Sequence, residues 1–384
     1  MRITAVRPRI VANTWKNWVL VELETDQGLT GLGEATLEHR TRTVATAIEE
    51  LAPKIVGYPV ESVNDLFGRM VRETYTPGIL VHTVLSGYET ALWDLLGQAV
   101  GRPLTELFGG TVRERIPSYA NGWYRVERTP KAFADAAMGA ASLGYRALKF
   151  DPFGAGSGEL SGPERHHALS LVQAVREAVP PEVDLIVEGH GRLTYGSALW
   201  VAEALQPFHP LWYEEPLRAD DTRNLGPLLR RSPVPIGVGE RAVTLSDFRA
   251  LLDLGPVGVL QPDVVHVGGL TAARKIAALA EAYGTPVAFH NAQGPISTAA
   301  SLVLAAVTPN AWLQEYFADF DPDWTHTLVE PPITLDADGF LRPPGGPGLG
   351  VRLRMDIAEA HPYDPLSAQN LYAEGWQLRK GRHD

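Results

Sequence analysis

Ionisable residues recur at nearly constant intervals through the second half of this 384-residue chain, each at the end of a short apolar run. Three of them are 26 residues apart, and the next three follow at intervals of 23, 27 and 25 residues: Glu188, Glu214, Glu240, Asp263, His290 and Glu315. Such an interval is close to the length of one strand–loop–helix unit. The spacing therefore predicts successive strands that end in the same register.

Apolar runs alternate with helical patterns from about residue 117 onward. Eight runs have the length and composition of buried strands, at 116–122, 147–151, 185–189, 211–215, 234–240, 258–263, 286–290 and 311–316. Eight strands alternating with helices favour a (β/α) barrel over an open sheet. In such barrels the carboxyl ends of the strands form a ring where active sites lie.

The flanking regions differ in pattern from the barrel region. Strand-like alternation up to residue 35 and helical spacing over 36–100 indicate a small α+β domain. The Gly- and Pro-rich tail is expected to pack back on that domain. We therefore predict three segments: an N-terminal domain, a barrel and a C-terminal segment, at 1–115, 116–335 and 336–384.

Composition excludes several classes of protein. The chain has no cysteine, so disulfides, thiolate nucleophiles and cysteine-ligated metals are excluded. A net charge of −11 argues against a nucleic-acid partner. No apolar run is long enough to suggest a membrane span, and the N-terminus lacks the apolar core of a signal peptide. We expect a cytoplasmic protein that acts on a small molecule, without a membrane partner.

Three glutamates at equivalent strand ends predict a metal site. Glu188, Glu214 and Glu240 would repel one another if they were packed together without a cation. An all-oxygen ligand set favours Mg²⁺, with Mn²⁺ as a substitute. The alternative is that each acid is solvated or caps the following helix.

Two histidines are candidates for proton transfer. His290 follows the strand after Asp263, and a neighbouring aspartate would fix its tautomer and raise its basicity, so His290 is the predicted base. His190, in the stretch "EGHGR", is a candidate general acid, or else a group that orients a metal ligand. Gly189 and Gly191 are expected to leave room for substrate. His266 is expected to be structural.

Taken in order, these motifs resemble the mandelate racemase subgroup of the enolase superfamily, and most closely its galactonate dehydratases and related sugar-acid dehydratases. The resemblance runs through nearly the whole chain, in "TDQGLTGLGEA", "ALWDLLGQAVGRPLTELFGG", "EGHGR", "EEP", "GER", "LQPDVVHVGGLTAARKIAALAEAYG" and "HNAQGPI". It implies an α/β fold: a modified (β/α)7β TIM-type barrel with an N-terminal α+β capping domain that the C-terminal tail completes. It also implies a homo-oligomer.

The resemblance further implies roles for particular residues. One Mg²⁺ per subunit would be held by Glu188, Glu214 and Glu240, with Glu215 behind them. His290 and Asp263 would form the base dyad, and His190 would be the acid for the leaving hydroxyl. Glu315 would donate a hydrogen bond to the substrate carboxylate or act on it electrostatically.

The sequence departs from this family pattern at two places. Glu188 stands where aspartate is common, and Lys149-Phe150-Asp151 replaces a Lys-x-Lys motif whose second lysine is a base in racemases. Lys149 is still expected to neutralise a substrate carboxylate. Asp151 is expected either to bind a substrate hydroxyl or to be a solvated loop acid.

The resemblance and the residues together predict dehydration of an aldonic or related acid sugar to a 2-keto-3-deoxy acid. The first alternative is a racemase or epimerase that uses His190 and His290 on opposite faces of the substrate. The second is a catalytically silent homologue. Substrate choice is expected to lie in N-terminal loops near Trp15, Lys16 and Tyr75, with Trp15 as a candidate substrate contact.

Overall fold

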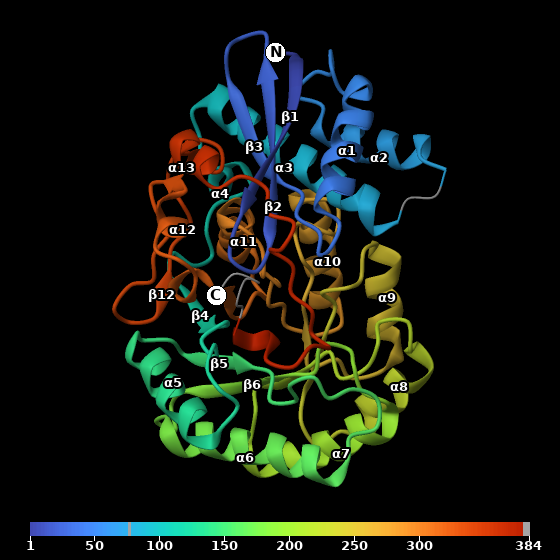
Figure 1. Cartoon of the computed structure of the whole chain (residues 1–384). Helices are drawn as coiled ribbons and strands as arrows, with labels where there is room; N and C mark the ends of the chain where they lie inside the picture. The colour runs from blue at the N-terminus through green and yellow to red at the C-terminus, as the bar shows by residue number, and fades with distance from the viewer. Residues whose placement is uncertain (76–77, 379–384) are drawn as a thin grey trace.

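The N-terminal region is a three-stranded antiparallel sheet covered by helices. The computed structural model describes residues 1–75 and 78–378 of the chain. The sheet has the order β1-β2-β3, and 22-residue α3 packs against it. The elements are β1 Ile3–Ala12, β2 Asn17–Thr25, β3 Thr30–Glu34, α1 Thr41–Leu51, α2 Val63–Glu73, α3 Ile79–Val100 and α4 Leu104–Leu107. Figure 1 shows this region, in blue, above the rest of the molecule.

The barrel strands are parallel neighbours in chain order, and β10 closes back on β4. They are β4 Ile116–Ala120, β5 Ala147–Phe150, β6 Asp184–Glu188, β7 Trp212–Glu214, β8 Ile236–Val238, β9 Val259–Leu260 and β10 Gln314–Tyr316. The predicted run 286–290 is too irregular to count as a strand. Val287 nevertheless makes parallel bridges to Leu260 and Ala311. This run therefore occupies the position of the seventh of eight barrel strands, here called the seventh place in the ring.

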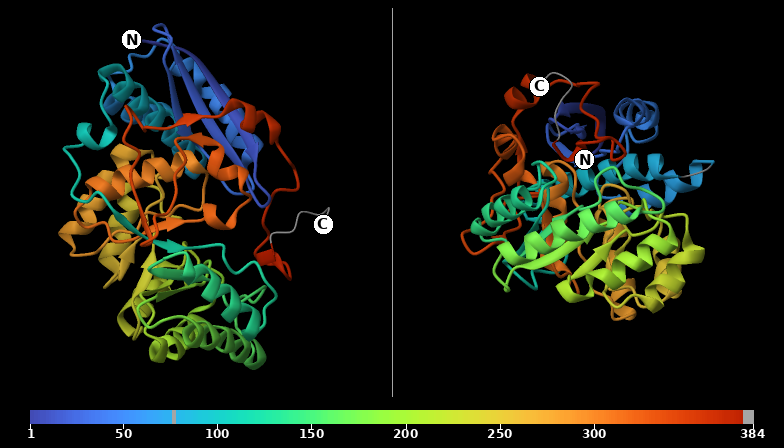
Figure 2. Two further views of the ribbon diagram at one scale, coloured as in Figure 1. Left: turned by 90° about the vertical axis from the view of Figure 1, so that its left-hand side faces the viewer. Right: turned by 60° about the horizontal axis from the view of Figure 1, so that its bottom comes forward.

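A helix follows each of the first seven places in the ring. These helices are α5 Pro130–Ser142, α6 Gly162–Ala178, α7 Tyr195–Leu205, α8 Thr222–Arg231, α9 Leu245–Leu254, α10 Leu270–Ala282 and α11 Pro295–Val307. Figure 2 shows them wrapped around the sheet. The eighth strand, β10, is not followed by an equivalent helix. The predicted (β/α)7β barrel with an N-terminal α+β domain is therefore confirmed.

The interior of the barrel is packed with side chains. One buried apolar residue from each place except β8 forms a cluster: Tyr119, Ala147, Ile186, Trp212, Val259, Ala288 and Leu313. At β8 the corresponding residue is Gly237, where a Cβ atom would lie 2.5 Å from the Trp212 ring. Because this layer fills the barrel, a ligand has room only at an end of the barrel.

Two buried glutamates of the N-terminal domain join it to the barrel. Glu34 accepts hydrogen bonds from the backbone N–H groups of Gly294 and Ser297, at the start of α11. Glu89 accepts them in the same way from Leu270 and Thr271, at the start of α10. Each carboxylate satisfies amide groups that a helix start leaves unpaired and faces the positive end of the helix dipole. These contacts fix the N-terminal domain over the last part of the barrel.

The C-terminal part returns to both domains. β12 Phe340–Leu341 pairs with β4, and β11 Val329–Glu330 pairs with β13 Arg352–Leu353. α12 Trp324–Thr327 and α13 Met355–Ala360 complete the regular elements, and α13 packs against β1. The boundaries predicted at 115 and 335 stay predictions, and residues 379–384 of the third segment lie outside the described part.

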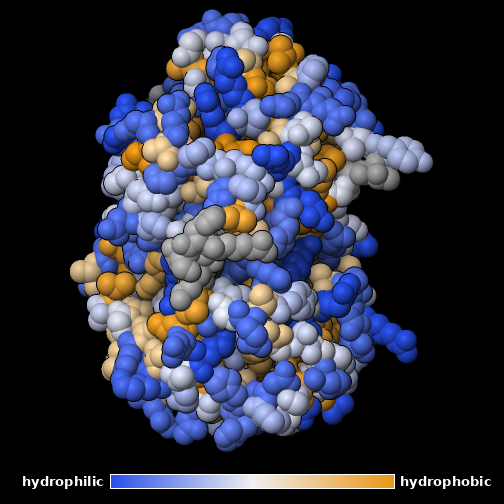
Figure 3. All heavy atoms as spheres, in the orientation of Figure 1, coloured by the Kyte–Doolittle hydropathy of each residue, from blue (hydrophilic) through white to orange (hydrophobic). Residues whose placement is uncertain are grey.

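The described helices and one face of the surface (Figure 3) bear on the question of a membrane segment. No described helix combines the length and the apolar character needed to cross a bilayer. The face in Figure 3 is mostly hydrophilic, with hydrophobic residues in small scattered groups.

Candidate active site

The predicted strand-end residues meet at one end of the barrel. Glu188 ends β6, Glu214 ends β7 and Glu315 lies within β10. Glu240 follows β8 and Asp263 follows β9. His290 is the last residue of the run 286–290 at the seventh place. A cavity of about 530 Å³ opens there between the barrel and the N-terminal domain. Its lining from the barrel includes Lys149, Glu188, His190, Glu240 and His290.

The three predicted metal ligands converge. Glu188, Glu214 and Glu240 each offer one carboxylate oxygen, and these oxygens lie within 4.8 Å of one another. Glu188 and Glu214 are fully buried. Burial, and next the neighbouring Glu214 charge, raise the pKa of Glu188 well above its ordinary value. Three carboxylates this close are costly without a cation, and an all-oxygen set fits a hard divalent ion.

Lys149 lies among these acids and is itself buried. Its Nζ atom is hydrogen-bonded to Glu214 Oε1 and lies 2.8 Å from Glu315 Oε1 and 3.2 Å from Glu188 Oε2. Burial alone would lower the pKa of Lys149, but the surrounding carboxylates raise it well above its ordinary value. These contacts fix the position of the Lys149 ammonium group among the carboxylates.

His290 is paired with Asp263 as the sequence predicts. Its Nδ1 atom lies 2.8 Å from Asp263 Oδ2, and Asp263 is fully buried. Burial would lower the pKa of His290, but the charges of Glu240, Glu315 and Asp263 raise it to about 10. The Nε2 atom lies 3.4 Å from Glu240 Oε2, beside the carboxylate cluster. A cation bound by Glu240 would offset part of this negative charge.

His266 and Gln293 are neighbours of the His290–Asp263 pair. Gln293 Nε2 donates to Asp263 Oδ2 at 3.2 Å, and Lys16 donates to Gln293 Oε1 at the same distance. His266 is buried, with Nδ1 3.1 Å from Thr83 Oγ1 of α3. Its structural assignment therefore agrees with its contacts, although its ring also reaches the cavity lining.

His190 has an equivalent aspartate that sequence reasoning did not assign to it. Its Nδ1 atom lies 2.6 Å from Asp151 Oδ2. The backbone of His190 is in the left-handed region, with φ of 50°, which is uncommon for a residue other than glycine. Its N–H donates to Glu188 Oε1 at 2.6 Å. Burial lowers the pKa of His190, although the hydrogen bond to Asp151 opposes the shift.

One of the two predicted roles of Asp151 is corrected by its surroundings. Its side chain is completely buried, so Asp151 is not a solvated loop acid. Its oxygens are used by His190, by the Arg192 guanidinium and by the Phe153 N–H, and binding of a substrate hydroxyl stays a prediction. Asp151 orients His190, and Arg192 compensates its charge.

Glu315 is held as a carboxylate. Burial would raise its pKa, but Lys149 and His290 lower it to about 2. Its oxygens accept hydrogen bonds from Asn121 Nδ2 and the Asn291 N–H, each at 2.8 Å. An ionised carboxylate only accepts hydrogen bonds, and these contacts suit the ionised form. Both predicted roles of Glu315, hydrogen-bond donor and electrostatic partner of the substrate carboxylate, stay predictions.

The glycines of "EGHGR" have a different purpose from the predicted one. A Cβ atom on Gly189 would lie 2.8 Å from the Glu215 carbonyl oxygen, and one on Gly191 would lie 1.9 Å from Arg241 Nη1. Gly191 also has φ of 64°. These glycines let the chain pack closely against neighbouring strand ends, and they do not make room for substrate.

The N-terminal loops contribute unequally to the cavity. Trp15 and Lys16 line it. Trp15 is nearly buried, donates from Nε1 to Asp321 and stacks on Phe317, so a packing role accounts for most of its surface. Tyr75 is fully exposed and is not part of the lining, and the adjoining residues 76–77 lie outside the described part.

Arginine side chains are the contributors that sequence reasoning missed. Arg241 pairs with Glu240 at 3.2 Å and donates to the His190 carbonyl oxygen at 2.9 Å. Its place in "GER", directly after a predicted ligand, was an available signal. Arg192 follows His190 by two residues, in "HGR".

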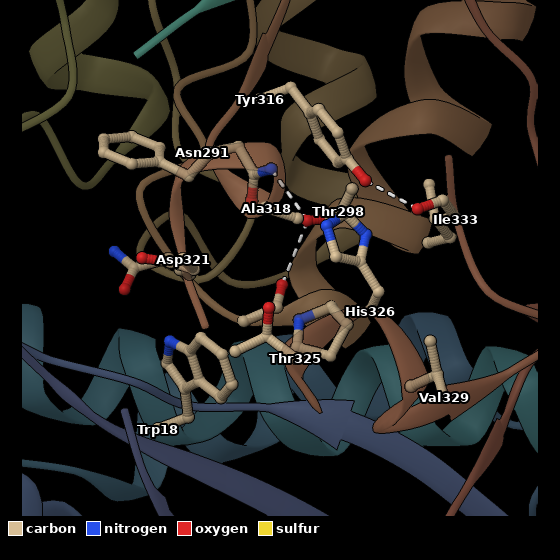
Figure 4. A pocket seen from close by; sticks show the side chains of 14 residues that line it. Trp18, Asn291, Thr298, Tyr316, Ala318, Asp321, Thr325, His326, Val329 and Ile333 are labelled. Atoms are coloured by element: carbon tan, nitrogen blue, oxygen red, sulfur yellow. Dashed lines mark hydrogen bonds between the residues drawn. The ribbon is translucent and has the colours of Figure 1, made fainter. Parts of the chain in front are cut away.

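A second cavity beside the site is too small for a sugar acid. It has a volume of about 30 Å³, close to the share of liquid volume that one water molecule occupies. Figure 4 shows it lined by Trp18, Asn291, Tyr316 and His326, with Asn291 hydrogen-bonded to Thr298. The larger cavity at the strand ends is therefore the candidate active site.

The chain matches two family models that together span most of it. Residues 4–109 match the mandelate racemase/muconate lactonizing enzyme N-terminal domain, and residues 132–357 match the enolase C-terminal domain-like family. Residues 358–384 lie beyond both matches.

Curated relatives and solved structures agree with these matches. The chain is 35% identical to a D-gluconate dehydratase of Thermoproteus tenax, over 91% of this chain and 71% of that protein. It is 34% identical to a D-galactonate dehydratase of Xanthomonas oryzae pv. oryzae, over 92% of this chain and 93% of the relative. A mandelate racemase/muconate lactonizing enzyme from Sulfitobacter sp. superposes with a TM-score of 0.89 at 31% identity, covering 95% of this chain and 96% of that one. The protein belongs to the mandelate racemase subgroup of the enolase superfamily.

Proposed function

We propose that the protein is a Mg²⁺-dependent dehydratase that converts an aldonic or related acid sugar to a 2-keto-3-deoxy acid. Dehydratases of gluconate and galactonate among its relatives support this class of reaction. The observation that carries the proposal is the arrangement of two His–Asp pairs. His190 and His290 follow the third and seventh of eight places in the ring, half a turn apart, with the carboxylate cluster between them.

The carboxylate cluster fits the metal that the family implies. Glu188, Glu214 and Glu240 would hold Mg²⁺ because they offer three converging hard oxygen ligands. When bound, Mg²⁺ supplies a Lewis acid that draws charge from the substrate carboxylate and makes the α-proton more acidic.

His290 is the proposed base. Asp263 holds its Nδ1–H, which leaves Nε2 to take the proton from the α-carbon. The electron pair of the broken C–H bond moves toward the carboxylate. Lys149, fixed by Glu214 and Glu315, supplies positive charge close to where this negative charge develops.

His190 is the proposed acid. Asp151 holds its Nδ1 atom, so Nε2 is the nitrogen that gives a proton to the departing C3 hydroxyl, which leaves as water. The resulting enol then takes up a proton at C3 and releases the proton of its C2 hydroxyl, and so becomes the 2-keto-3-deoxy acid. Acid and base on opposite sides of the ring approach the two reacting carbons from different faces.

The test is a screen of mono- and diacid sugars with Mg²⁺, read as 2-keto acid formation with semicarbazide. We expect at least one substrate, and loss of turnover with EDTA that added Mg²⁺ restores. The same pair of histidines would also serve an epimerase. Exchange of the α-hydrogen in D₂O without loss of water from any sugar acid would therefore replace the dehydratase proposal by that alternative.

A further inference from the structure

The C-terminal segment 363–378, here called the strap, joins the two domains across the cavity. At its start, Asn17 Nδ2 donates to the carbonyl oxygens of Asp364 and Ser367, at 2.7 and 3.1 Å. At its end, Trp376 and Gln377 contact loops that follow β4 and β5. Figure 1 shows this red segment running down the front of the molecule from β2 to the region of β5 and β6, and Figure 2 shows it from the side.

The strap forms one wall of the candidate active site. It contributes seven lining residues to the 530 Å³ cavity: Tyr363, Pro365, Ser367, Ala368, Gln369, Leu371 and Trp376. Arg192, which holds Asp151, also donates to the Leu371 carbonyl oxygen at 2.8 Å. The strap is therefore attached to the same group that orients His190.

Trp376 is the strap residue in contact with the proposed acid. Its indole and the His190 imidazole have centroids 5.5 Å apart and planes at 89°, an edge-to-face arrangement. Trp376 is only 7% exposed, and its Nε1 donates to the Gly154 carbonyl oxygen at 2.9 Å.

Cationic groups hold the indole from other sides. The Arg128 and Arg192 guanidinium groups lie 5.4 and 5.9 Å from the indole centroid. Arg128 Nε also donates to Gln377 Oε1 at 3.1 Å. Trp376 thus gives the imidazole a contact that does not involve Asp151.

The strap follows residue 357, where the match to the barrel family ends. A segment that lines the cavity and contacts the proposed acid is suited to set both substrate fit and the position of that acid.

We propose that Trp376 is a positioning residue for His190, and that the strap thereby sets the geometry of proton transfer to the leaving hydroxyl. The expected change in dehydration rate rests on the proposed function. The expected effect of Trp376 on the position of the His190 ring does not. Proton removal by His290, on the opposite side of the cavity, does not depend on Trp376.

The kinetic test compares Trp376→Ala and Trp376→Phe with Tyr372→Ala, a matched variant of an exposed aromatic residue on the same strap. Because misplacement by about 1 Å can cost about 100-fold in rate, Trp376→Ala should lower kcat for dehydration by about 10- to 100-fold. Exchange of the α-hydrogen in D₂O should be retained. Trp376→Phe keeps an aromatic ring and should recover part of the loss, whereas Tyr372→Ala should equal the parent. Equal loss of exchange and dehydration in Trp376→Ala would overturn the proposal, as would unchanged kcat.

A second measurement needs no turnover and separates failure of this inference from failure of the proposed function. Diethyl pyrocarbonate modifies accessible neutral imidazoles, and mass spectrometry assigns the rate to each histidine. Trp376→Ala should increase the rate at His190 severalfold and leave the rate at His290 unchanged, while Tyr372→Ala changes neither. An unchanged rate at His190 would show that the strap does not hold the ring, whatever substrate the enzyme uses.

Discussion

His190 Nδ1 lies 2.6 Å from Asp151 Oδ2, in a pairing that repeats the one between His290 and Asp263 half a turn away around the barrel. Both aspartates are fully buried. In each pair the aspartate fixes the tautomer and leaves Nε2 for proton transfer. Their environments differ, because burial lowers the pKa of His190 whereas the acids around His290 raise its pKa to about 10. In the metal-free protein these directions favour a neutral His190 and a protonated His290, which is the reverse of the proposed roles. The proposed roles therefore require metal and substrate binding to shift both pKa values.

Asp263→Asn should lower proton removal without unfolding the site. The amide keeps the size of the side chain but removes the charge that favours the Nδ1–H tautomer of His290 and its protonated form. Because acid–base catalysis is worth about 10²- to 10⁴-fold, kcat and the rate of α-hydrogen exchange should fall together within that range. Asp338→Asn, at an exposed loop, is the control. A loss confined to KM would contradict this role.

Glu188→Gln should abolish stabilisation by Mg²⁺. For the parent protein, Mg²⁺ at about 100 times its Kd should add about 2.7 kcal/mol to the free energy of unfolding. The variant lacks one ligand and should show no rise in Tm with Mg²⁺ in a thermal melt. Without metal it should melt above the parent, because burial and Glu214 disfavour the charge at this position. Glu330→Gln, on the surface, should behave as the parent. A preserved Mg²⁺ effect would exclude Glu188 as a ligand.

Mg²⁺ binding should lower the pKa of His290. In the metal-free protein, Glu240, Glu315 and Asp263 together raise this pKa to about 10, so the imidazole is protonated at neutral pH. A cation held by Glu240 opposes the attraction that stabilises the imidazolium, so its binding should release protons. NMR titration of His290 in EDTA and in Mg²⁺, with calorimetry in buffers of different ionisation enthalpy, measures this. If the pKa of His290 is the same in EDTA and in Mg²⁺, His290 is not electrostatically coupled to the metal site.

Gly191→Ala should destabilise the fold at the acid side of the site. A Cβ atom would meet Arg241 Nη1 at 1.9 Å, and the backbone has φ of 64°. Such strain costs about 1–3 kcal/mol, measurable by denaturant unfolding. Gly345 has no heavy atom within 4 Å of a Cβ position and no positive φ, so Gly345→Ala is the control. Equal stability of the two variants would show that the loop adapts.

The recurring strand ends made the barrel and its site predictable. Hydrophobic runs with polar ends at a nearly constant interval place Glu188, Glu214 and Glu240 together because parallel strands share an edge. The run that ends at His290 forms only isolated bridges. Its apolar pattern therefore predicted its position in the barrel but did not predict that it would be too irregular for a regular strand.

Contacts between distant segments were not predictable in this way. In the sequence, Asp151 follows a strand and has the pattern of a solvated acid. In the fold, His190 and Arg192 contact its carboxylate. Trp376 lies in a tail without periodicity, and its contact with His190 depends on how the chain crosses the cavity. Gly191 was explained wrongly because the neighbouring Arg241 belongs to a strand end two places further along the barrel.

The most direct test of the central claim is to incubate His190→Asn and His290→Asn with a substrate of the parent enzyme in D₂O with Mg²⁺. Deuterium at the α-carbon and 2-keto acid are measured in the same sample. We expect that His290→Asn loses both signals, whereas His190→Asn loses 2-keto acid but still exchanges deuterium. Exchange retained in His290→Asn, or dehydration retained in His190→Asn, would contradict the assignment of base and acid to the two sides of the cavity.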